Sequence, residues 1–168
     1  MRKVIFELEV FGLKKASIVF SLIFSVMLVM TCVASAAGRI SMSEVSLGGI
    51  SIGSSMDYVR SVYGEPTKIK TDKTPYQSWS YYRYGNSVEL AVLDNDNTVH
   101  KIQVTANNGF ATPAGVTVGM DRNTLYSVYG RPMSSNSTGC FYSASADCGL
   151  TFTFNSRTGK ITKIVASY

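Results

Sequence analysis

Aromatic and basic side chains gather in one short stretch of the chain, which reads Trp-Ser-Tyr-Tyr-Arg-Tyr. Tryptophan, tyrosine and arginine are enriched at protein-binding hot spots, because each buries a large area and keeps a polar tip. The stretch alternates as a strand does, so its rings cannot all lie on one face. One pair of rings could instead be core and the other could pack between two halves of the molecule. The residues that we predict to bind a partner are Trp79, Tyr81, Tyr82, Arg83 and Tyr84.

The chain offers few groups for catalysis or metal binding. His100 is its only histidine, and no catalytic motif in the sequence places a serine and an acid with it. The polar run 94–97 suggests calcium, but an EF-hand loop needs Gly and Glu where this sequence has Val99 and Thr105. We interpret the run as a hairpin turn. We therefore predict a non-enzymatic protein with no catalytic residue, no metal and no cofactor.

Two cysteines, Cys140 and Cys148, lie in the part of the chain that follows an apolar N-terminal stretch. Residues 141–143 and 149–151 have the pattern of two strands around a short turn. Two directly opposed strand residues have Cβ atoms roughly 4.5–5.5 Å apart, which is close to disulfide reach. We predict a disulfide between Cys140 and Cys148, and a pair of free thiols is the alternative.

The N-terminal stretch, residues 1–36, has a basic start, an apolar run from Ala16 to Val33 and small residues up to Ala36. This order is typical of a secretory signal peptide, with cleavage after Ala36. An uncleaved membrane anchor is one alternative, since the run is just long enough to span a bilayer. Lipid attachment at Cys32 is another, but Thr31 fits poorly before a lipidated cysteine. We expect an exported protein.

The charge pattern limits the class of partner. The chain has 168 residues, 16% of them charged, and a formal net charge of +5. Beyond residue 36 it holds 12 Lys and Arg against 9 Asp and Glu, and no run of five basic residues. The sequence therefore predicts a protein partner and no nucleic acid, with membrane contact only through an uncleaved leader.

An internal repeat is the strongest signal in the sequence. Residues 50–66 and 116–132 share six of 17 positions at an offset of 66, where chance gives about one. In each copy a predicted capping residue, Ser54 or Asp121, precedes a short inward-facing helical stripe that includes Val62 or Val128. Each stripe ends at Gly-x-Pro, and period-two segments follow. We predict an α+β fold, each copy being a short helix packed on a three-stranded antiparallel meander. The predicted divisions are a signal peptide (1–36), a lead-in (37–49), a first repeat (50–109) and a second repeat (110–168).

These motifs resemble a known family. Ile52-Gly53, Tyr63-Gly64-Glu65-Pro66 and Trp79-Ser80-Tyr81 are similar to elements of the SmpA/OmlA (BamE-like) fold, and two units in tandem look like the β-lactamase-inhibitor-protein architecture. The second copy lacks the Trp-x-Tyr element.

The resemblance implies an exported protein-binding module without catalysis, binding through an exposed aromatic strand or a groove between the repeats. One alternative is an outer-membrane assembly accessory or a structural protein of the cell envelope. The other is a protein that binds glycan or peptidoglycan by stacking on Trp79 and Tyr81.

Overall fold

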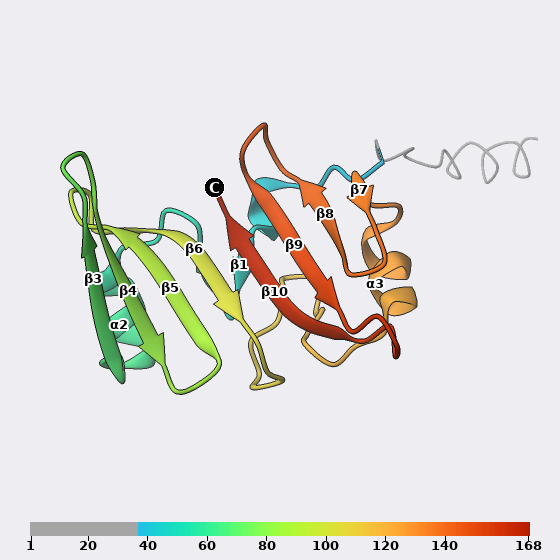
Figure 1. The fold of residues 1–168 in the computed structure, drawn as a ribbon, viewed down its shortest axis with the longest axis horizontal. Helices are drawn as coiled ribbons and strands as arrows, with labels where there is room; N and C mark the ends of the chain where they lie inside the picture. The colour runs from blue at the N-terminus through green and yellow to red at the C-terminus, as the bar shows by residue number, and fades with distance from the viewer. Residues whose placement is uncertain (1–36) are drawn as a thin grey trace, which may run out of the picture. The chain divides into compact units, whose positions relative to one another are not determined.

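Two short helices and a long sheet make up most of the structure, a computed structural model that describes residues 37–168 (Figure 1). The predicted signal peptide, its cleavage after Ala36 and the lipid site at Cys32 lie outside the described residues. Within residues 37–168 we find no helix with the length and apolar character needed to cross a membrane. In chain order the elements are η1 (Met42–Glu44), β1 (Ser46–Leu47), β2 (Ile50–Ser51), α2 (Met56–Tyr63), β3 (Lys68–Lys73), β4 (Ser78–Tyr84), β5 (Val88–Leu93), β6 (Thr98–Val104), α3 (Arg122–Tyr129), β7 (Ser134–Ser135), β8 (Gly139–Ser143), β9 (Gly149–Phe154) and β10 (Ile161–Ser167).

The ends of both helices follow from local chemistry. Ser55 caps α2, because its hydroxyl accepts a hydrogen bond from the Tyr58 N–H at 3.2 Å. The predicted cap, Ser54, is wrong by one residue. Gly64 (φ 74°) follows α2 and Gly130 (φ 71°) follows α3, and these positive φ angles stop each helix.

Only part of each predicted helical stripe is buried. Met56 and Val59 of α2 and Leu125 of α3 are fully buried. Val62, which we expected to face inward, is 52% exposed, and its counterpart Val128 is also exposed. Each helix is therefore held by few side chains, which is typical of helices too short to be stable alone.

Eight strands form one antiparallel sheet in the order β3-β4-β5-β6-β10-β9-β8-β7, and β1 and β2 form a separate hairpin. The α+β class is confirmed. The three-stranded meander is wrong, since each helix is followed by four strands. The first of these, β3 and β7, were missed because every residue of both is exposed, so neither has an alternating apolar pattern. Antiparallel pairing of β6 with β10 joins the two meanders edge to edge.

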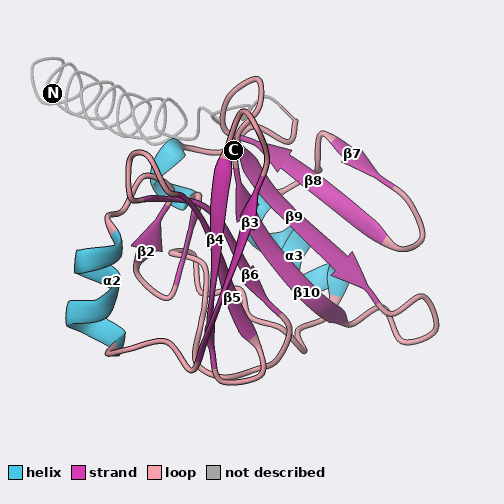
Figure 2. Cartoon of the chain, turned by 60° about the vertical axis from the view of Figure 1, so that its left-hand side comes forward, coloured by secondary structure: helices cyan, strands magenta, loops and turns pink. Residues whose placement is uncertain are grey.

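The helices cover one face of this sheet. Tyr84 on β4 donates its hydroxyl hydrogen to the Gly64 carbonyl after α2, and Tyr142 on β8 does the same to Gly130 after α3, at 3.2 and 2.7 Å. In Figure 1 α2 lies behind the β3–β4 end and α3 lies near β7 and β8, and Figure 2 shows both helices from the side. Strand pairing places one row of residues on this helix-covered face: Ile69, Tyr82, Leu90, Ile102, Ala166, Leu150 and Tyr142.

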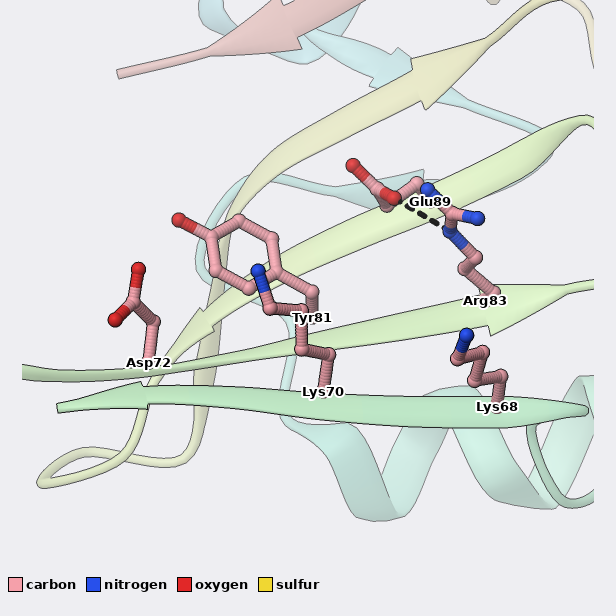
Figure 3. Close-up of a pocket in the computed structure, with 6 residues that line it drawn as sticks. All are labelled: Lys68, Lys70, Asp72, Tyr81, Arg83 and Glu89. Atoms are coloured by element: carbon pink, nitrogen blue, oxygen red, sulfur yellow. Dashed lines mark hydrogen bonds and ion pairs between the residues drawn. The ribbon is translucent and has the colours of Figure 1, made fainter.

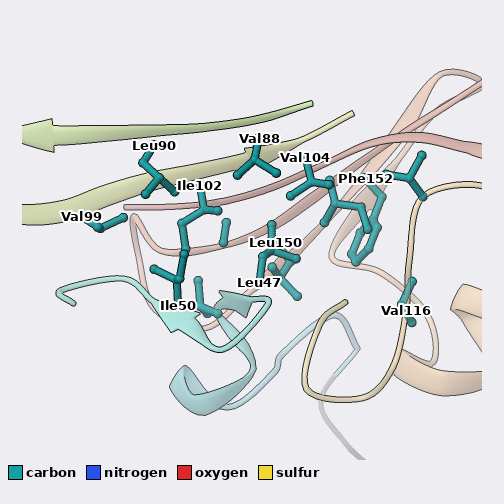
Figure 4. Packing of buried hydrophobic residues seen from close by; sticks show 14 of the residues in the cluster. Leu47, Ile50, Val88, Leu90, Val99, Ile102, Val104, Val116, Leu150 and Phe152 are labelled. Atoms are coloured by element: carbon teal, nitrogen blue, oxygen red, sulfur yellow. The ribbon is translucent and has the colours of Figure 1, made fainter. Parts of the chain in front are cut away.

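The lead-in segment is part of the core. Leu47 and Ile50 are fully buried, and they lie under the sheet against residues of both meanders (Figure 4). The hydroxyl of Tyr129, at the end of α3, is hydrogen-bonded to the Glu44 carboxylate at 2.7 Å. Burial raises the pKa of Tyr129 above its ordinary value. Residues 37–49 therefore pack against the second repeat, although they precede the first repeat in the sequence.

This contact has a counterpart in the other copy. Tyr63, at the end of α2, packs its ring on Phe110 with 5.0 Å between the ring centroids. Tyr63 and Tyr129 are 66 positions apart, as are Glu44 and Phe110, so each helix-end tyrosine contacts the segment that leads into the other copy. The described residues accordingly belong to one compact unit.

The predicted disulfide is wrong, because both cysteines are free and buried. Cys140 pairs with Phe152 across β8 and β9, whereas the carbonyl of Cys148 accepts a hydrogen bond from Ala144. The two cysteines are thus four residue positions apart along the hairpin, roughly 14 Å at the usual strand rise, too far for a disulfide. Burial raises the pKa of Cys140 to about 12 and also raises that of Cys148, so both thiols stay protonated and serve as core side chains.

Candidate functional site

The five residues of the predicted binding strand lie on two different faces of β4. Tyr82 and Tyr84 lie on the helix-covered face. The Arg60 guanidinium lies 5.6 Å from the Tyr82 ring centroid, and the Tyr84 ring meets the Tyr63 ring edge-on at 6.3 Å. Burial is the main reason that the pKa of Tyr84 is raised. Tyr82 and Tyr84 therefore pack α2 against the sheet.

Trp79, Tyr81 and Arg83 lie on the opposite face, which no helix of residues 37–168 covers. We call it the open face, and strand pairing defines it by the row Lys68, Arg83, Glu89, Gln103, Val165, Thr151 and Phe141. A strand that shows aromatic side chains on both faces can hold a helix with one and meet a ligand with the other.

A pocket on the open face lies at the β3–β5 end of the sheet. Figure 3 shows its side chains standing on the side of the strands away from the helix. Arg83 forms an ion pair with Glu89, Nε to Oε2 at 2.7 Å. The Tyr81 ring lies beside this pair, so the pocket combines an aromatic surface with charged groups of both signs. The residues that line it are Lys68, Lys70, Asp72, Tyr81, Arg83 and Glu89.

A second pocket adjoins the first at Tyr81 and lies where the two meanders meet. It takes residues from β4, β5 and β6 of the first meander and from the C-terminal end of the second. This position combines the two surfaces that the sequence suggested, the aromatic strand and the junction between the repeats. The lining residues are Trp79, Tyr81, Ala91, His100, Lys101, Ser167 and Tyr168.

His100 reaches the open face because of a β-bulge. Strand β6 pairs Lys101 with Ala91 and Val99 with Val92, so His100 is an extra residue. Bulges re-aim side chains in this way. The sequence itself indicates the bulge. The buried residues of β6 are Val99, Ile102 and Val104, and the first two are three positions apart, whereas a regular strand would space them by two.

Aromatic and acidic neighbours hold the His100 ring. Its Nε2 lies 3.2 Å from the Asp96 carboxylate, and its ring packs edge-on against Trp79 with centroids 5.5 Å apart. The ring centroid of Tyr168 is 5.8 Å away on the other side. The backbone N–H of Thr98 is the main group that lowers the pKa of Asp96, so this carboxylate is ionised at neutral pH.

The open face brings together aromatic, basic and acidic side chains. Within residues 37–168 no group of three or more His, Cys, Asp or Glu side chains could hold a metal ion. Sequence reasoning missed Lys68, Lys70, Lys101 and Tyr168 as site residues. The two lysines of β3 were missed with their strand. Lys101 and Tyr168 were missed because only the β6–β10 pairing brings them to Trp79.

Comparisons with known proteins find a shared fold. No family model matches the chain, and no curated protein matches it in sequence. It is similar to a cysteine-rich secretory protein from Staphylococcus aureus subsp. aureus Mu50, with 9% identity and a TM-score of 0.52 over 69% of this chain and 44% of that one. It is also similar to an extracellular protein containing an SCP domain from Bacillus anthracis str. Ames, with 13% identity and a TM-score of 0.49 over 69% of this chain and 43% of that one. The chain therefore spans less than half the length of either structure.

This finding corrects the resemblance drawn from the motifs. The BamE-like assignment and the β-lactamase-inhibitor-like architecture are wrong, since the fold matches a different group of proteins and has four strands in each meander. The motifs that suggested the resemblance are helix-ending glycines and prolines with alternating aromatics. Such features occur wherever a short helix precedes a meander, so they do not distinguish one fold of this kind from another.

Proposed function

We propose that the chain is an exported, non-enzymatic module that binds a partner protein on its open face, around Trp79 and Tyr81. The observation that carries this proposal is that the two pockets share Tyr81, which joins aromatic and basic side chains in one surface on strands paired within the sheet. A preformed surface limits the entropy lost on binding. Tyrosine, tryptophan and arginine together are typical of binding hot spots.

The contrast between the two meanders supports the choice of the first. In the second meander the open face carries mostly neutral side chains, Thr151 and Thr153 on β9 and Val165 on β10, together with one ring, Phe141, and one lysine, Lys163. By strand pairing, Gly139 is the counterpart of Tyr81 and Phe141 is the counterpart of Arg83. The first copy therefore has the denser cluster of aromatic and charged groups, which favours a role for that copy.

Export is part of the same proposal. Its support is the order of basic, apolar and small residues in residues 1–36. The Staphylococcus aureus protein that shares the fold is described as secretory, which agrees with it.

Site-specific photo-crosslinking tests the proposal. With benzoylphenylalanine in place of Tyr81, we expect a protein adduct of discrete mass in cells that make the chain. With the same group in place of Tyr58, which is exposed on α2, we expect none. Excess unlabelled chain should compete for the adduct, and the Trp79→Ala chain should compete poorly.

Two results would contradict the proposal. Equal adducts from positions 81 and 58 would show contact without a preferred face. An adduct at position 81 that resists protease and is released by a glycan-degrading enzyme would favour glycan binding by stacking on Trp79 and Tyr81, in place of a protein partner.

A further inference from the structure

Strand β3 is an edge strand of the sheet that residues 37–168 form. All six of its residues, Lys68–Lys73, are exposed, and β4 pairs with it on one side. The Thr74 N–H donates to the Gln77 carbonyl at 2.8 Å, in the register that continues along β3 and β4. Hydrogen-bonded and non-hydrogen-bonded pairs alternate in an antiparallel ladder. The residues that direct their N–H and C=O groups away from β4 are therefore Ile69, Thr71 and Lys73.

The side chains of this edge are sorted by face. Lys68 and Lys70 stand on the open face, in the pocket that contains Tyr81. Among the described residues neither lysine takes part in an ion pair. Ile69 stands on the other face and is 51% exposed although it is apolar. The edge thus shows a Lys-Ile-Lys pattern to any strand that pairs with it.

The geometry points to β-augmentation: an extended segment of the partner pairs antiparallel with β3, with acidic residues opposite Lys68 and Lys70 and an apolar residue opposite Ile69. The two lysines occupy the non-hydrogen-bonded positions of this new pair, where opposed side chains lie closest. Main-chain hydrogen bonds would supply affinity and the alternating side chains would supply specificity. The inference rests on the proposed function in one respect, that the partner is a protein.

Charge selects an acidic segment over a second copy of this chain. Strand β3 carries three lysines and one aspartate, so two such strands repel each other. Two copies paired antiparallel about Lys70 would place the two Lys70 side chains directly opposite each other, and like charges in opposed positions destabilise a strand pair. Lys68 of each copy would then oppose Asp72 of the other, so the penalty falls on the central pair. Lysines on an edge are also a common protection against self-association. An acidic segment opposite Lys68 and Lys70 avoids this lysine–lysine repulsion.

A blocked ten-residue peptide with the core Thr-Glu-Val-Glu serves as the probe. By NMR we expect it to slow the amide exchange of Ile69, Thr71 and Lys73. A twin peptide with an N-methylated valine keeps every side chain and loses one ladder hydrogen bond, so we expect it to bind about tenfold or more weakly.

Matched variants of the protein test the same pairing. Thr71→Pro removes an outward N–H and leaves the bonds to β4 in place, so it should weaken the peptide about tenfold or more. Thr71→Val also loses the Thr71–Ser80 hydroxyl contact but keeps the N–H, and should bind as the unchanged protein does. Lys68→Glu with Lys70→Glu should reverse the preference toward a lysine peptide, whereas Lys163→Glu should not.

The inference is overturned if no peptide binds at millimolar concentration, if the N-methylated twin binds equally well, or if Thr71→Pro has no effect. Protection of the three edge amides that grows with protein concentration alone would assign the edge to a second copy and also overturn it. None of these results touches the adduct at position 81, and loss of that adduct would leave the peptide results standing. The two proposals therefore fail separately.

Discussion

Phe152→Ala is expected to lower the free energy of unfolding by about 3–5 kcal/mol, the usual cost of removing a buried phenylalanine ring. Phe152 is fully buried on β9, at the centre of the second meander. Its ring meets the Tyr142 ring edge-on with centroids 6.0 Å apart and lies 6.2 Å from the Tyr129 ring. Removing it leaves a cavity under α3, because both tyrosines are held by hydrogen bonds. Urea denaturation followed by circular dichroism measures the change.

Phe141→Ala is the matched control for this prediction. Phe141 lies on β8, next to the strand that carries Phe152, but its side chain lies on the open face and is only partly buried. It should cost less than half as much. Equal costs for the two variants would show that the faces of the second meander are assigned wrongly.

Leu47→Ala is expected to cost about 2–5 kcal/mol, as is usual for a leucine in a well-packed core. Leu47 belongs to the predicted lead-in, and no pattern in the sequence placed this segment in the core. It is fully buried and packs with residues of both meanders. The same denaturation experiment measures the effect.

Met42→Ala provides the comparison within the same segment. Met42 is 46% exposed, so its truncation should change the free energy of unfolding by less than about 0.5 kcal/mol. If Leu47→Ala were as mild, residues 37–49 would be a tail that the core does not need.

The helices could be predicted from sequence because they carry strong local signals. Capping residues precede them, Gly-x-Pro follows them, and the repeat shows each signal twice. Strand β3 could not be predicted, since Lys68–Lys73 is exposed on both faces and has no apolar period. Its existence depends on pairing with β4, which is a tertiary effect that local pattern does not record.

The register of the β8–β9 hairpin could not be predicted from the sequence either. The disulfide prediction assumed that Cys140 and Cys148 lie directly opposite, but a hairpin's register depends on where its turn closes. The structure closes this turn at Ala144 and Cys148. The sequence does indicate the two bulges. On β10 the buried residues Ile161, Ile164 and Ala166 are spaced by three and then two positions, as the buried residues of β6 are.

The candidate site was predicted in part. The alternation of β4 required its aromatic residues to divide between two faces, and the structure places Trp79 and Tyr81 together on the open one. The sequence could not show which face was open. It also could not bring Lys70 and Tyr168 to them, because these residues come from β3 and from the C-terminal end of the chain.

The affinity of the partner captured at position 81 tests the central claim most directly. Its dissociation constant should rise about tenfold or more in the Tyr81→Ala chain, as expected for a hot-spot tyrosine. In the Tyr58→Ala chain, which loses an exposed tyrosine from α2, it should stay within about twofold. Equal losses in the two chains, or an unchanged dissociation constant in Tyr81→Ala, would contradict the assignment of the open face as the binding surface.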